Sequence, residues 1–294
     1  MKNNIQGVGV ALVTPFTQNG EVDYDALGRV VEHVTRGGVD YLVALGTTAE
    51  TATLPRQEQQ EILAFIRKCN GARLPLVVGI GGNSTDDVIG RFREFDLDDA
   101  AAVLNVTPYY NKPGQRGLYE HYKAVAEASP VPVLLYNVPG RTGVNMTAET
   151  TLKLAREVRN IIGIKEASGF LSQITCLLRD RPEGFLVISG DDGIALPLAA
   201  LGSDGLISVA ANALPELVAE MMRTAAAGDN KKAAALHLRL HGVIDALFAE
   251  GSPTGIKALL AAKGIIENYL RLPLVPASDA LQERFGQLIR KYDL

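Results

Sequence analysis

The sequence predicts an α/β protein: a (β/α)8 (TIM) barrel followed by a C-terminal helical extension. Eight apolar runs of strand length recur along residues 7–209, and segments with helical periodicity separate them. From about Pro215 onward only helical patterns remain. Alternating strands and helices favour a parallel sheet, and eight such units in this length fit a closed barrel. We therefore expect a catalytic barrel at residues 1–224 and a helical extension at residues 225–294.

The expected strands are short apolar runs rich in β-branched residues. They are Gly7–Leu12, Tyr41–Leu45, Leu76–Ile80, Ala102–Val106, Val133–Tyr136, Ile161–Ile164, Phe185–Ser189 and Gly205–Val209. The expected helices start or stop at residues typical of helix ends. In the barrel they are Asp23–Thr35, Arg56–Cys69, Asp86–Leu97, Gly117–Ala128, Thr147–Arg156, Phe170–Leu178 and Ile194–Leu201, and in the extension Pro215–Ala227, Asn230–Ala249, Thr254–Lys263 and Asp279–Lys291.

An open, doubly wound sheet is the alternative fold. It would carry a glycine-rich nucleotide loop after its first strand, but Val13–Phe16 contains no glycine. The later run Gly79–Asn83 fails as a dinucleotide loop because Ser84 stands where the last glycine belongs. The closed barrel is the better prediction.

Composition and charge exclude several classes of protein. With 294 residues, 47% of them hydrophobic, the chain can bury a large core. The net charge of −4, without a long basic run, argues against binding to nucleic acid or an acidic membrane surface. No apolar stretch is long enough to span a bilayer, and the N-terminus lacks a signal-peptide run, so we expect a cytoplasmic protein. Cys69 and Cys176 alone suit a reducing compartment better than a disulfide framework.

The histidines argue against a metal enzyme. A metal-dependent aldolase or hydrolase would place histidines and carboxylates at strand ends. All four fall in expected helices: His33, His121, His237 and His241. The last two have the i,i+4 spacing of a metalloprotease helix but lack the glutamate after the first histidine. We expect no metal and no cofactor.

The clearest chemical signal lies in Ile161–Gly169, where an apolar run ends in Lys165. Side chains alternate along a strand, so Ile162 and Ile164 share one face and Lys165 lies on the other. If the isoleucines pack against helices, the lysine points into the barrel. Burial there disfavours its charged form, so the free amine can form a Schiff base with a carbonyl substrate. The alternative is an ordinary strand-end lysine that reaches solvent or pairs with Glu166.

Function in a (β/α)8 barrel collects where the strands end. The other strand ends carry hydroxyl, amide and glycine residues: Thr14, Gly46–Glu50, Gly82–Asn83, Thr107–Asn111, Tyr136–Asn137, Ser189–Asp191 and Ser208. Such a ring can bind a carboxylate and relay protons, as imine and enamine chemistry at Lys165 requires. Residues of these types are also common in any loop. A lysine combined with two threonines, two tyrosines and an arginine favours a reactive site.

Three motifs resemble the signatures of the pyruvate-dependent class I aldolases related to N-acetylneuraminate lyase. They are Gly46–Leu54, Tyr136–Thr142 and Gly163–Gly169, in the family's order and spacing, and the resemblance runs from about Gly7 to the C-terminal helices. Ala49 replaces the family's usual glycine, which matters only if that backbone needs a positive φ. The resemblance implies condensation of pyruvate with L-aspartate semialdehyde, on the diaminopimelate route to lysine.

The resemblance also implies a role for each matching residue. Lys165 forms the pyruvate imine, and Thr48 holds the pyruvate carboxylate. The imine becomes an enamine whose methyl carbon is the nucleophile. Tyr136 is the central acid and base, hydrogen-bonded to Thr47 and Tyr110 in a proton relay.

Substrate binding and assembly involve further positions. Gly190 and Ile207 complete the expected substrate-binding set. Arg141 is expected to bind the semialdehyde carboxylate, since a planar guanidinium can grip a carboxylate with two hydrogen bonds. Lyases of the family that act on sialic acids usually lack this arginine. The resemblance further implies that Tyr110 enters the neighbouring subunit's site, in a homotetramer built as a dimer of dimers.

Feedback-inhibited members of the family bind lysine at the tight-dimer interface. The matching positions here are Thr51, Ala52, Arg56, Gln59, Asn83, Asp87 and Tyr109. Arg56 and Gln59 replace histidines of well-inhibited relatives, and Asp87 is one methylene shorter than their glutamate. An added cation repels a cationic effector, so we expect weak or absent inhibition by lysine.

Two other classes of function stay open. Another pyruvate or 2-oxo-acid aldolase, such as a sugar-acid or sialic-acid lyase, would share Lys165, Tyr136 and Thr48 but would not need Arg141. A catalytically silent barrel would bind a 2-oxo acid for regulation, because fold alone does not fix function. The first would accept other aldehydes, and the second would turn over none.

Overall fold

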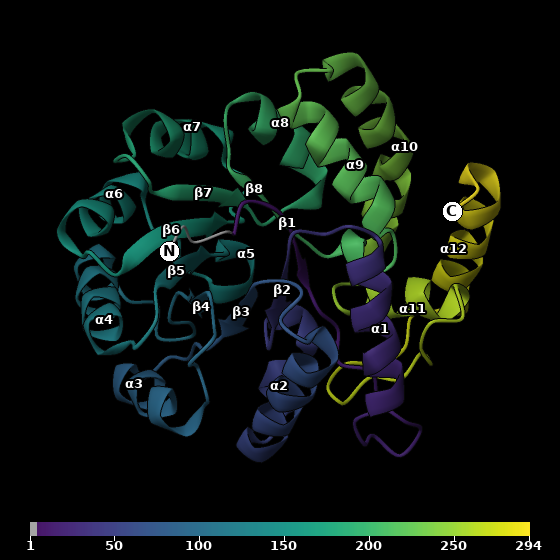
Figure 1. The fold of residues 1–294 in the computed structure, drawn as a ribbon, viewed down its shortest axis with the longest axis horizontal. Helices are drawn as coiled ribbons and strands as arrows, with labels where there is room; N and C mark the ends of the chain where they lie inside the picture. Colours follow the sequence, from purple (N-terminus) through teal and green to yellow (C-terminus); the bar gives the residue numbers. More distant parts are fainter. Residues whose placement is uncertain (1–4) are drawn as a thin grey trace. The chain divides into compact units, whose positions relative to one another are not determined.

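The computed structural model describes residues 5–294 (Figure 1). The first four residues, which begin the N-terminal stretch where the sequence predicts no targeting signal, lie outside this range. Eight strands follow one another in chain order around a closed barrel, which confirms the expected fold class. The chain forms two compact units: the first is Pro75–Ile207 with residues 5 and 6, and the second is Gly7–Leu74 with Ser208–Leu294. The domain boundary expected at residues 224 and 225 stays a prediction.

The first unit contains most of the strands. They are β3 (Leu76–Gly79), β4 (Ala102–Val106), β5 (Val133–Asn137), β6 (Ile161–Glu166), β7 (Leu186–Ser189) and β8 (Gly205–Ser208), each parallel to the next. The last residue of β8 belongs to the second unit. Its helices are α3 (Thr85–Glu94), α4 (Gln115–Ala128), α5 (Pro139–Thr142), α6 (Ala148–Glu157), α7 (Leu171–Asp180) and α8 (Ala195–Ala200), with the 3-10 turn η3 (Asp192–Ile194) before the last.

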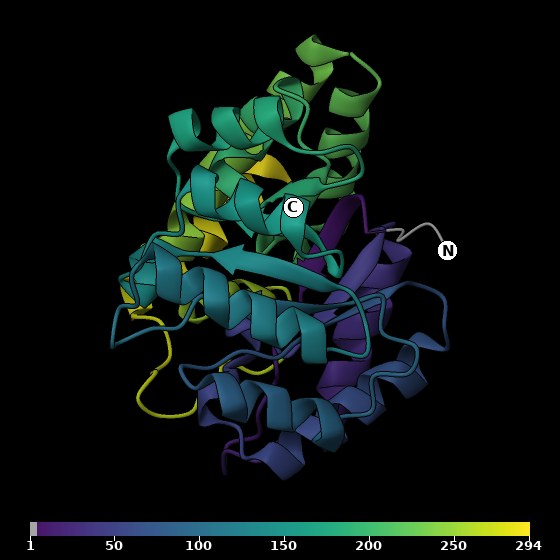
Figure 2. The ribbon, with the colours of Figure 1, turned by 90° about the vertical axis from the view of Figure 1, so that its left-hand side faces the viewer.

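The outward strand faces of this unit are covered by its helices. Figure 2 shows those helices, blue to teal, facing the viewer. Leu135 of β5 and Ile164 of β6 are fully buried in one apolar cluster with Tyr122 of α4 and Ile174 of α7. Burying such a side chain fully stabilises the fold by about 1.5–3 kcal/mol. The expectation that Ile164 packs against helices is therefore confirmed.

The same expectation is wrong for Ile162, which is only half-buried and lies outside this cluster. Val133 of β5 lies opposite Ile161, but the next residue of β5 lies opposite Gly163. Ile162 is thus the extra residue of a bulge, where regular alternation of side chains breaks. Alternation resumes after the bulge, so Ile164 still faces the helices.

The second unit contains the remaining elements. They are β1 (Gly7–Ala11), α1 (Tyr24–Arg36), β2 (Tyr41–Ala44), the 3-10 turns η1 (Thr47–Ala49) and η2 (Thr51–Thr53), α2 (Arg56–Asn70), the 3-10 turn η4 (Ala210–Asn212), α9 (Pro215–Ala226), α10 (Asn230–Phe248), α11 (Thr254–Ala262) and α12 (Asp279–Tyr292). Strands β1 and β2 are parallel. The four C-terminal helices expected from the sequence are present, and α10 packs against α9, α11 and α12.

Most observed bounds differ from the expected ones by a residue or two, and α3 shows why. It begins at Thr85 because the Ser84 hydroxyl accepts a hydrogen bond from the backbone N–H of Asp87, at 3.4 Å. It ends at Glu94, earlier than expected, because Phe95 has an extended backbone and a buried side chain.

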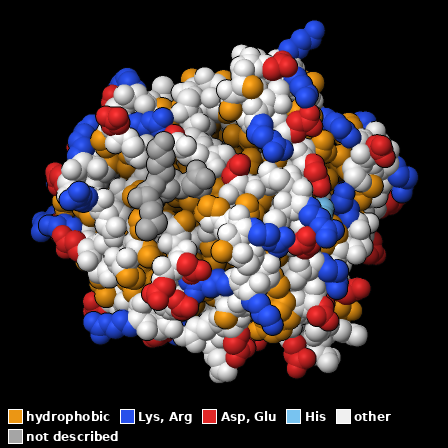
Figure 3. All heavy atoms as spheres, viewed as in Figure 1, with side chains coloured by type: hydrophobic (Ala, Val, Ile, Leu, Met, Phe, Trp, Pro, Cys, Tyr) orange, Lys and Arg blue, Asp and Glu red, His pale blue; other side chains and the backbone are white. Residues whose placement is uncertain are grey.

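Acidic and basic side chains are interspersed over the face of the molecule in Figure 3, without a large field of one sign. No helix within residues 5–294 is long and apolar enough to cross a membrane.

Candidate active site

Lys165 lies where the sequence places it, on the inward face of a barrel strand. Its neighbour Ile164 faces the helices, so Lys165 faces the other way, and its residue is only 6% exposed. Tyr136 lies directly opposite on β5. The Lys165 Nζ is 4.3 Å from the centroid of the Tyr136 ring. The first unit therefore brings together the amine and the phenol, and a solvent-exposed strand-end lysine is ruled out.

Strands β5 and β6 both run further than the sequence predicts, and the extra residues include Lys165. Parallel pairing continues through Tyr136 with Lys165 and Asn137 with Glu166. The expected strands stopped at the last apolar residue. Here the polar residues that follow are buried, so the ladder of backbone hydrogen bonds continues through them. Lys165 and Tyr136 thus lie on strand ends that are held by the backbone pairing of β5 and β6.

Gly190 leaves the space that Lys165 occupies. A Cβ atom at position 190 would lie 2.9 Å from the Lys165 Cε and 2.7 Å from the Ala167 Cβ. The backbone N–H of Gly190 donates to the Glu166 carbonyl at 2.8 Å, which fixes the turn after β7. Ile207, on β8, is fully buried.

Arg141 lies on a single helical turn, α5, directly after β5. The turn is fixed by Thr142, whose hydroxyl donates to the Val138 carbonyl at 3.2 Å and accepts from the Val144 N–H at 3.3 Å. Gly143 ends the turn with a positive φ of 71°. The Arg141 side chain is exposed.

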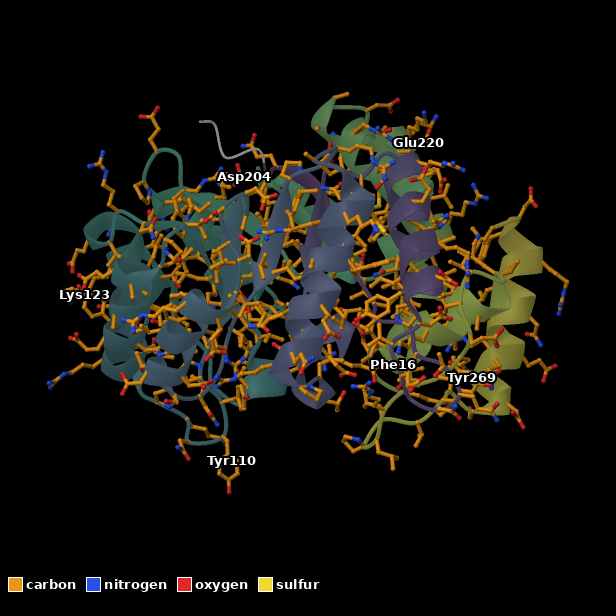
Figure 4. All side chains as sticks on the ribbon, turned by 60° about the horizontal axis from the view of Figure 1, so that its bottom comes forward. Phe16, Tyr110, Lys123, Asp204, Glu220 and Tyr269 are labelled. Carbon is orange, nitrogen blue, oxygen red and sulfur yellow. The ribbon has the colours of Figure 1, made fainter. Side chains whose placement is uncertain are left out.

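Tyr110 does not join the pair within one chain. Its φ is 72° and its residue is 85% exposed. Figure 4 shows the ring projecting away from the ribbon. No hydrogen bond joins it to Tyr136 in the described part of the chain. A positive φ at a bulky residue is strained and is tolerated only where the surrounding structure demands it.

Thr47 and Thr48 lie in the second unit, on the 3-10 turn η1 that follows β2. Thr48 is buried and Thr47 is exposed. The turn is closed by the Thr51 hydroxyl, which donates to the Gly46 carbonyl at 2.8 Å. The non-glycine positive φ values of this loop fall on the residues before Gly46 and after Ala49. Alanine therefore fits at position 49 without backbone strain.

The residue after Ala49 begins a feature that the sequence analysis missed. Glu50 is buried and forms an ion pair with Lys257 of α11, whose side chain is also fully buried. The Lys257 Nζ donates to the Tyr269 carbonyl at 2.9 Å and lies 4.1 Å from the centroid of the Phe16 ring. Phe16 and Tyr269 are labelled in Figure 4. The backbone N–H of Arg271 also donates to Glu50, at 3.1 Å.

Burial lowers the pKa of Lys257 to about 8, although Glu50 acts in the opposite direction. The Arg271 guanidinium binds both oxygens of Glu58, at 2.5 and 2.8 Å, which holds the pKa of Glu58 below its ordinary value. The Glu50–Lys257 pair joins the loop of Thr48 to the C-terminal segment, and the Glu58–Arg271 pair joins α2 to it. The partners are more than two hundred residues apart in the chain, so no local pattern could reveal them.

Two of the positions that match the lysine-binding region, Gln59 and Asp87, are engaged in other contacts. The buried Gln59 side chain donates to the carbonyls of Leu54 at 2.7 Å and Thr51 at 3.3 Å. The Asp87 carboxylate forms an ion pair with Arg91 at 2.8 Å. Of the rest, Arg56, Asn83 and Tyr109 are exposed, and Thr51 and Ala52 lie in the turn η2.

The four histidines lie in helices, as expected: one in α1, one in α4 and two in α10. Within residues 5–294, no group of three or more histidine, cysteine and acidic side chains is arranged to hold a metal ion. The expectation of no metal and no cofactor stays a prediction.

The chain matches the model of the Dihydrodipicolinate synthetase family over residues 4–292. A 4-hydroxy-tetrahydrodipicolinate synthase of Parabacteroides distasonis is 47% identical over 99% of this chain and 98% of its own length. The crystal structure of dihydrodipicolinate synthase from Aquifex aeolicus is 39% identical, with a TM-score of 0.95 over 99% of each chain. The chloride-inhibited dihydrodipicolinate synthase from Acinetobacter baumannii, complexed with pyruvate, is 40% identical, with a TM-score of 0.95 over 98% of this chain and 99% of that one. The chain belongs to the dihydrodipicolinate synthetase family.

Proposed function

We propose that this chain condenses pyruvate with L-aspartate semialdehyde through an imine on Lys165. Family membership over the whole chain makes it a 4-hydroxy-tetrahydrodipicolinate synthase, a lyase that works through a Schiff base. The observation that carries the assignment to Lys165 is its place on the inward face of β6, buried beside Tyr136. A buried amine next to a phenol has both the nucleophile and the proton-transfer group of imine chemistry.

The reaction begins with attack of the Lys165 amine on the keto carbon of pyruvate. Loss of water gives the imine, and loss of a methyl proton gives the enamine. The enamine carbon bonds to the aldehyde carbon of the semialdehyde, and the aldehyde oxygen takes up a proton. The amino group of the semialdehyde then attacks the imine carbon and displaces Lys165, which closes the ring and frees the enzyme. Tyr136 moves protons in these steps.

Recognition of the two substrates falls to different parts of the chain. Thr48, buried on the turn after β2, holds the pyruvate carboxylate, and Gly190 leaves room for the imine beside Lys165. Arg141 binds the carboxylate of the semialdehyde. The presence of Arg141 favours the synthase over a sugar-acid or sialic-acid lyase, which would not need it.

The site is completed by a second copy of the chain. Tyr110 is exposed and strained here, which supports a role outside its own chain. In our proposal it enters the neighbouring subunit's site and joins Thr47 and Tyr136 in the proton relay. The assembly is a homotetramer, a dimer of dimers in which each dimer shares its tyrosines. The cytoplasmic location expected from the sequence stays a prediction.

Borohydride trapping tests the proposal. Pyruvate and borohydride together convert an imine to a stable secondary amine, which mass spectrometry assigns to one residue. We expect the adduct on Lys165, and none in Lys165→Arg. Lys257 is an internal control, because it too is a buried lysine but lies inside an ion-pair cluster. An adduct on Lys257, or no adduct on a folded and assembled enzyme, would refute the assignment of the pyruvate imine to Lys165.

A second measurement identifies the aldehyde. Turnover of L-aspartate semialdehyde is compared with turnover of sugar aldehydes under the same conditions. Preference for a sugar aldehyde would indicate a related lyase, and pyruvate binding without turnover of any aldehyde would indicate a silent barrel.

A further inference from the structure

A buried carboxylate lies directly behind the proposed Schiff-base lysine. Glu166 follows Lys165 in β6, so its side chain lies on the opposite face of the strand, and it is fully buried. No ion pair with Glu166 occurs within residues 5–294. A buried charge without a counter-ion is costly unless several hydrogen bonds replace its water.

Three neutral groups donate hydrogen bonds to this carboxylate. The Ser168 N–H donates to Oε1 at 2.7 Å, the Asn137 Nδ2 donates to Oε2 at 3.0 Å and to Oε1 at 3.2 Å, and the Gln173 Nε2 donates to Oε2 at 3.2 Å. Burial raises the pKa of Glu166, while these bonds favour its charged form and act in the opposite direction.

The direction of these bonds is fixed by the backbone. The Met146 N–H can only donate, and it donates to the Asn137 Oδ1 at 3.0 Å. The amide nitrogen of Asn137 must therefore face Glu166. The Ser168 N–H is likewise only a donor. A group that accepts at both oxygens is required at position 166, and an ionised carboxylate is the side chain that does so.

The strand register connects this cluster to the reactive pair. Asn137 lies opposite Glu166, and one residue earlier Tyr136 lies opposite Lys165. The outward pair and the inward pair are thus consecutive rungs of the same two strands. The Asn137 Nδ2 also donates to Asn145, at 2.8 Å, so the cluster reaches the segment that follows the turn of Arg141.

We propose that Glu166 and Asn137 are positioning residues that hold Lys165 and Tyr136 in register for imine formation. The inference rests on the proposed roles of Lys165 and Tyr136. Neither Glu166 nor Asn137 touches the substrate, because both side chains lie on the outer face of the strands. Misplacement of reacting groups by about 1 Å can slow a reaction about 100-fold. Loss of the hydrogen bonds between Glu166 and Asn137 should therefore reduce the rate of imine formation more than it changes pyruvate binding.

The test is a polarity exchange. Glu166→Gln keeps the shape but turns an amide nitrogen toward the donors of Asn137 and Gln173. We expect the rate of borohydride-trappable imine formation to fall about 10- to 100-fold, with a smaller change in pyruvate KM. Asn137→Asp alone places two carboxylates together and should be at least as slow. The double variant Asn137→Asp/Glu166→Gln restores one donor–acceptor pair and should recover much of the rate.

Asn160→Asp is the matched control. Asn160 lies just before β6, at the opposite end of the strand, and donates to the carbonyls of Ala126, Ser129 and Val131. This variant should lose stability but keep its rate of imine formation. Rates are measured well below each melting temperature, so that loss of folded protein does not enter the comparison.

Three results would overturn the inference. One is an equal imine rate in Glu166→Gln and Asn160→Asp, and another is a double variant no faster than the slower single one. If Glu166→Gln does not fold, Gln173→Ala removes one donor and leaves both strands intact. An imine rate equal to that of the wild type in Gln173→Ala is the third. Absence of an imine in the wild-type enzyme would instead refute the proposed function, so the two failures are distinguishable.

Discussion

Replacing Lys257 by methionine tests how the loop of Thr48 is held. The change keeps the unbranched, apolar stem of the side chain but removes the ammonium group that pairs with Glu50. Glu50 would remain buried, with the Arg271 N–H as a donor. Removing one partner of a buried ion pair costs about 3–5 kcal/mol, because the other charge is left uncompensated. We expect the free energy of unfolding of Lys257→Met to fall by that amount.

The pKa of Lys257 shows that the ion pair itself contributes little net stability. A fall from the ordinary 10.5 to about 8 means that burial outweighs the attraction of Glu50. The difference corresponds to roughly 3 kcal/mol against the charged lysine in the fold. Removing both charges, in Glu50→Gln/Lys257→Met, should therefore cost less than removing one. We expect the double variant to lose about 2 kcal/mol or less.

Chemical denaturation at neutral pH measures these losses, with Lys263→Met as the control. Lys263 lies just after the end of α11 and is only partly buried, so its loss should change the free energy of unfolding by less than about 1 kcal/mol. A double variant as unstable as Lys257→Met would show that removing the charge of Glu50 relieves none of the loss, and would refute the reasoning. Pyruvate KM should rise in Lys257→Met, because the loop of Thr48 loses its anchor.

The change in stability with pH tests whether the pKa of Lys257 is lowered in the folded chain. The folded pKa of Lys257 is below the unfolded value, so between about pH 8 and 10.5 the unfolded chain holds a proton that the folded chain has released. The stability of the wild type relative to the double variant should therefore rise with pH across this window. A fall would contradict the lowered pKa.

Four further predictions follow from the site. Gly190→Ala should destabilise the fold by about 1–3 kcal/mol and slow adduct formation, since its Cβ would meet Ala167 and Lys165 at under 3 Å; normal trapping in a variant of normal stability would refute this. Tyr110→Phe should stay folded but lose most activity in steady-state assays, and full activity would remove the proton relay. Arg141→Ala should raise the semialdehyde KM much more than the pyruvate KM, and equal changes would count against its role. Free lysine should inhibit weakly or not at all, and strong inhibition at sub-millimolar lysine would contradict this.

Much of the fold follows from the sequence because its signals are local. Each strand is a short apolar run and each helix has its own periodicity and caps, so eight units could be counted without knowing their contacts. The inward direction of Lys165 followed from alternation with Ile164 alone. The position of Ile162 could not be predicted in the same way. A bulge depends on the register of two strands, and the sequence of one strand alone does not reveal it.

The polar groups behind the site could not be predicted for a related reason. A pattern-based prediction ends a strand at the first polar residue, yet Asn137 and Glu166 continue their strands because they satisfy each other. The partners of Glu50 lie in the C-terminal segment, where a lysine and an arginine within helical or loop patterns suggest only solvated charges. Burial of such groups is decided by contacts far along the chain.

Two buried carboxylates, Glu50 and Glu166, suggest how the residues of the candidate site are kept in place. Glu50 comes two residues after Thr48, and Glu166 comes directly after Lys165. Each is buried and bound by groups from other segments, so moving it would leave a buried charge without partners. Because moving either carboxylate costs free energy, the residue near it in the chain, Thr48 or Lys165, is also held in place. In our proposal, Thr48 and Lys165 bind the substrate and so cannot be held by strong partners of their own. Variants of these carboxylates should therefore alter the reaction rate without altering any group that touches the substrate.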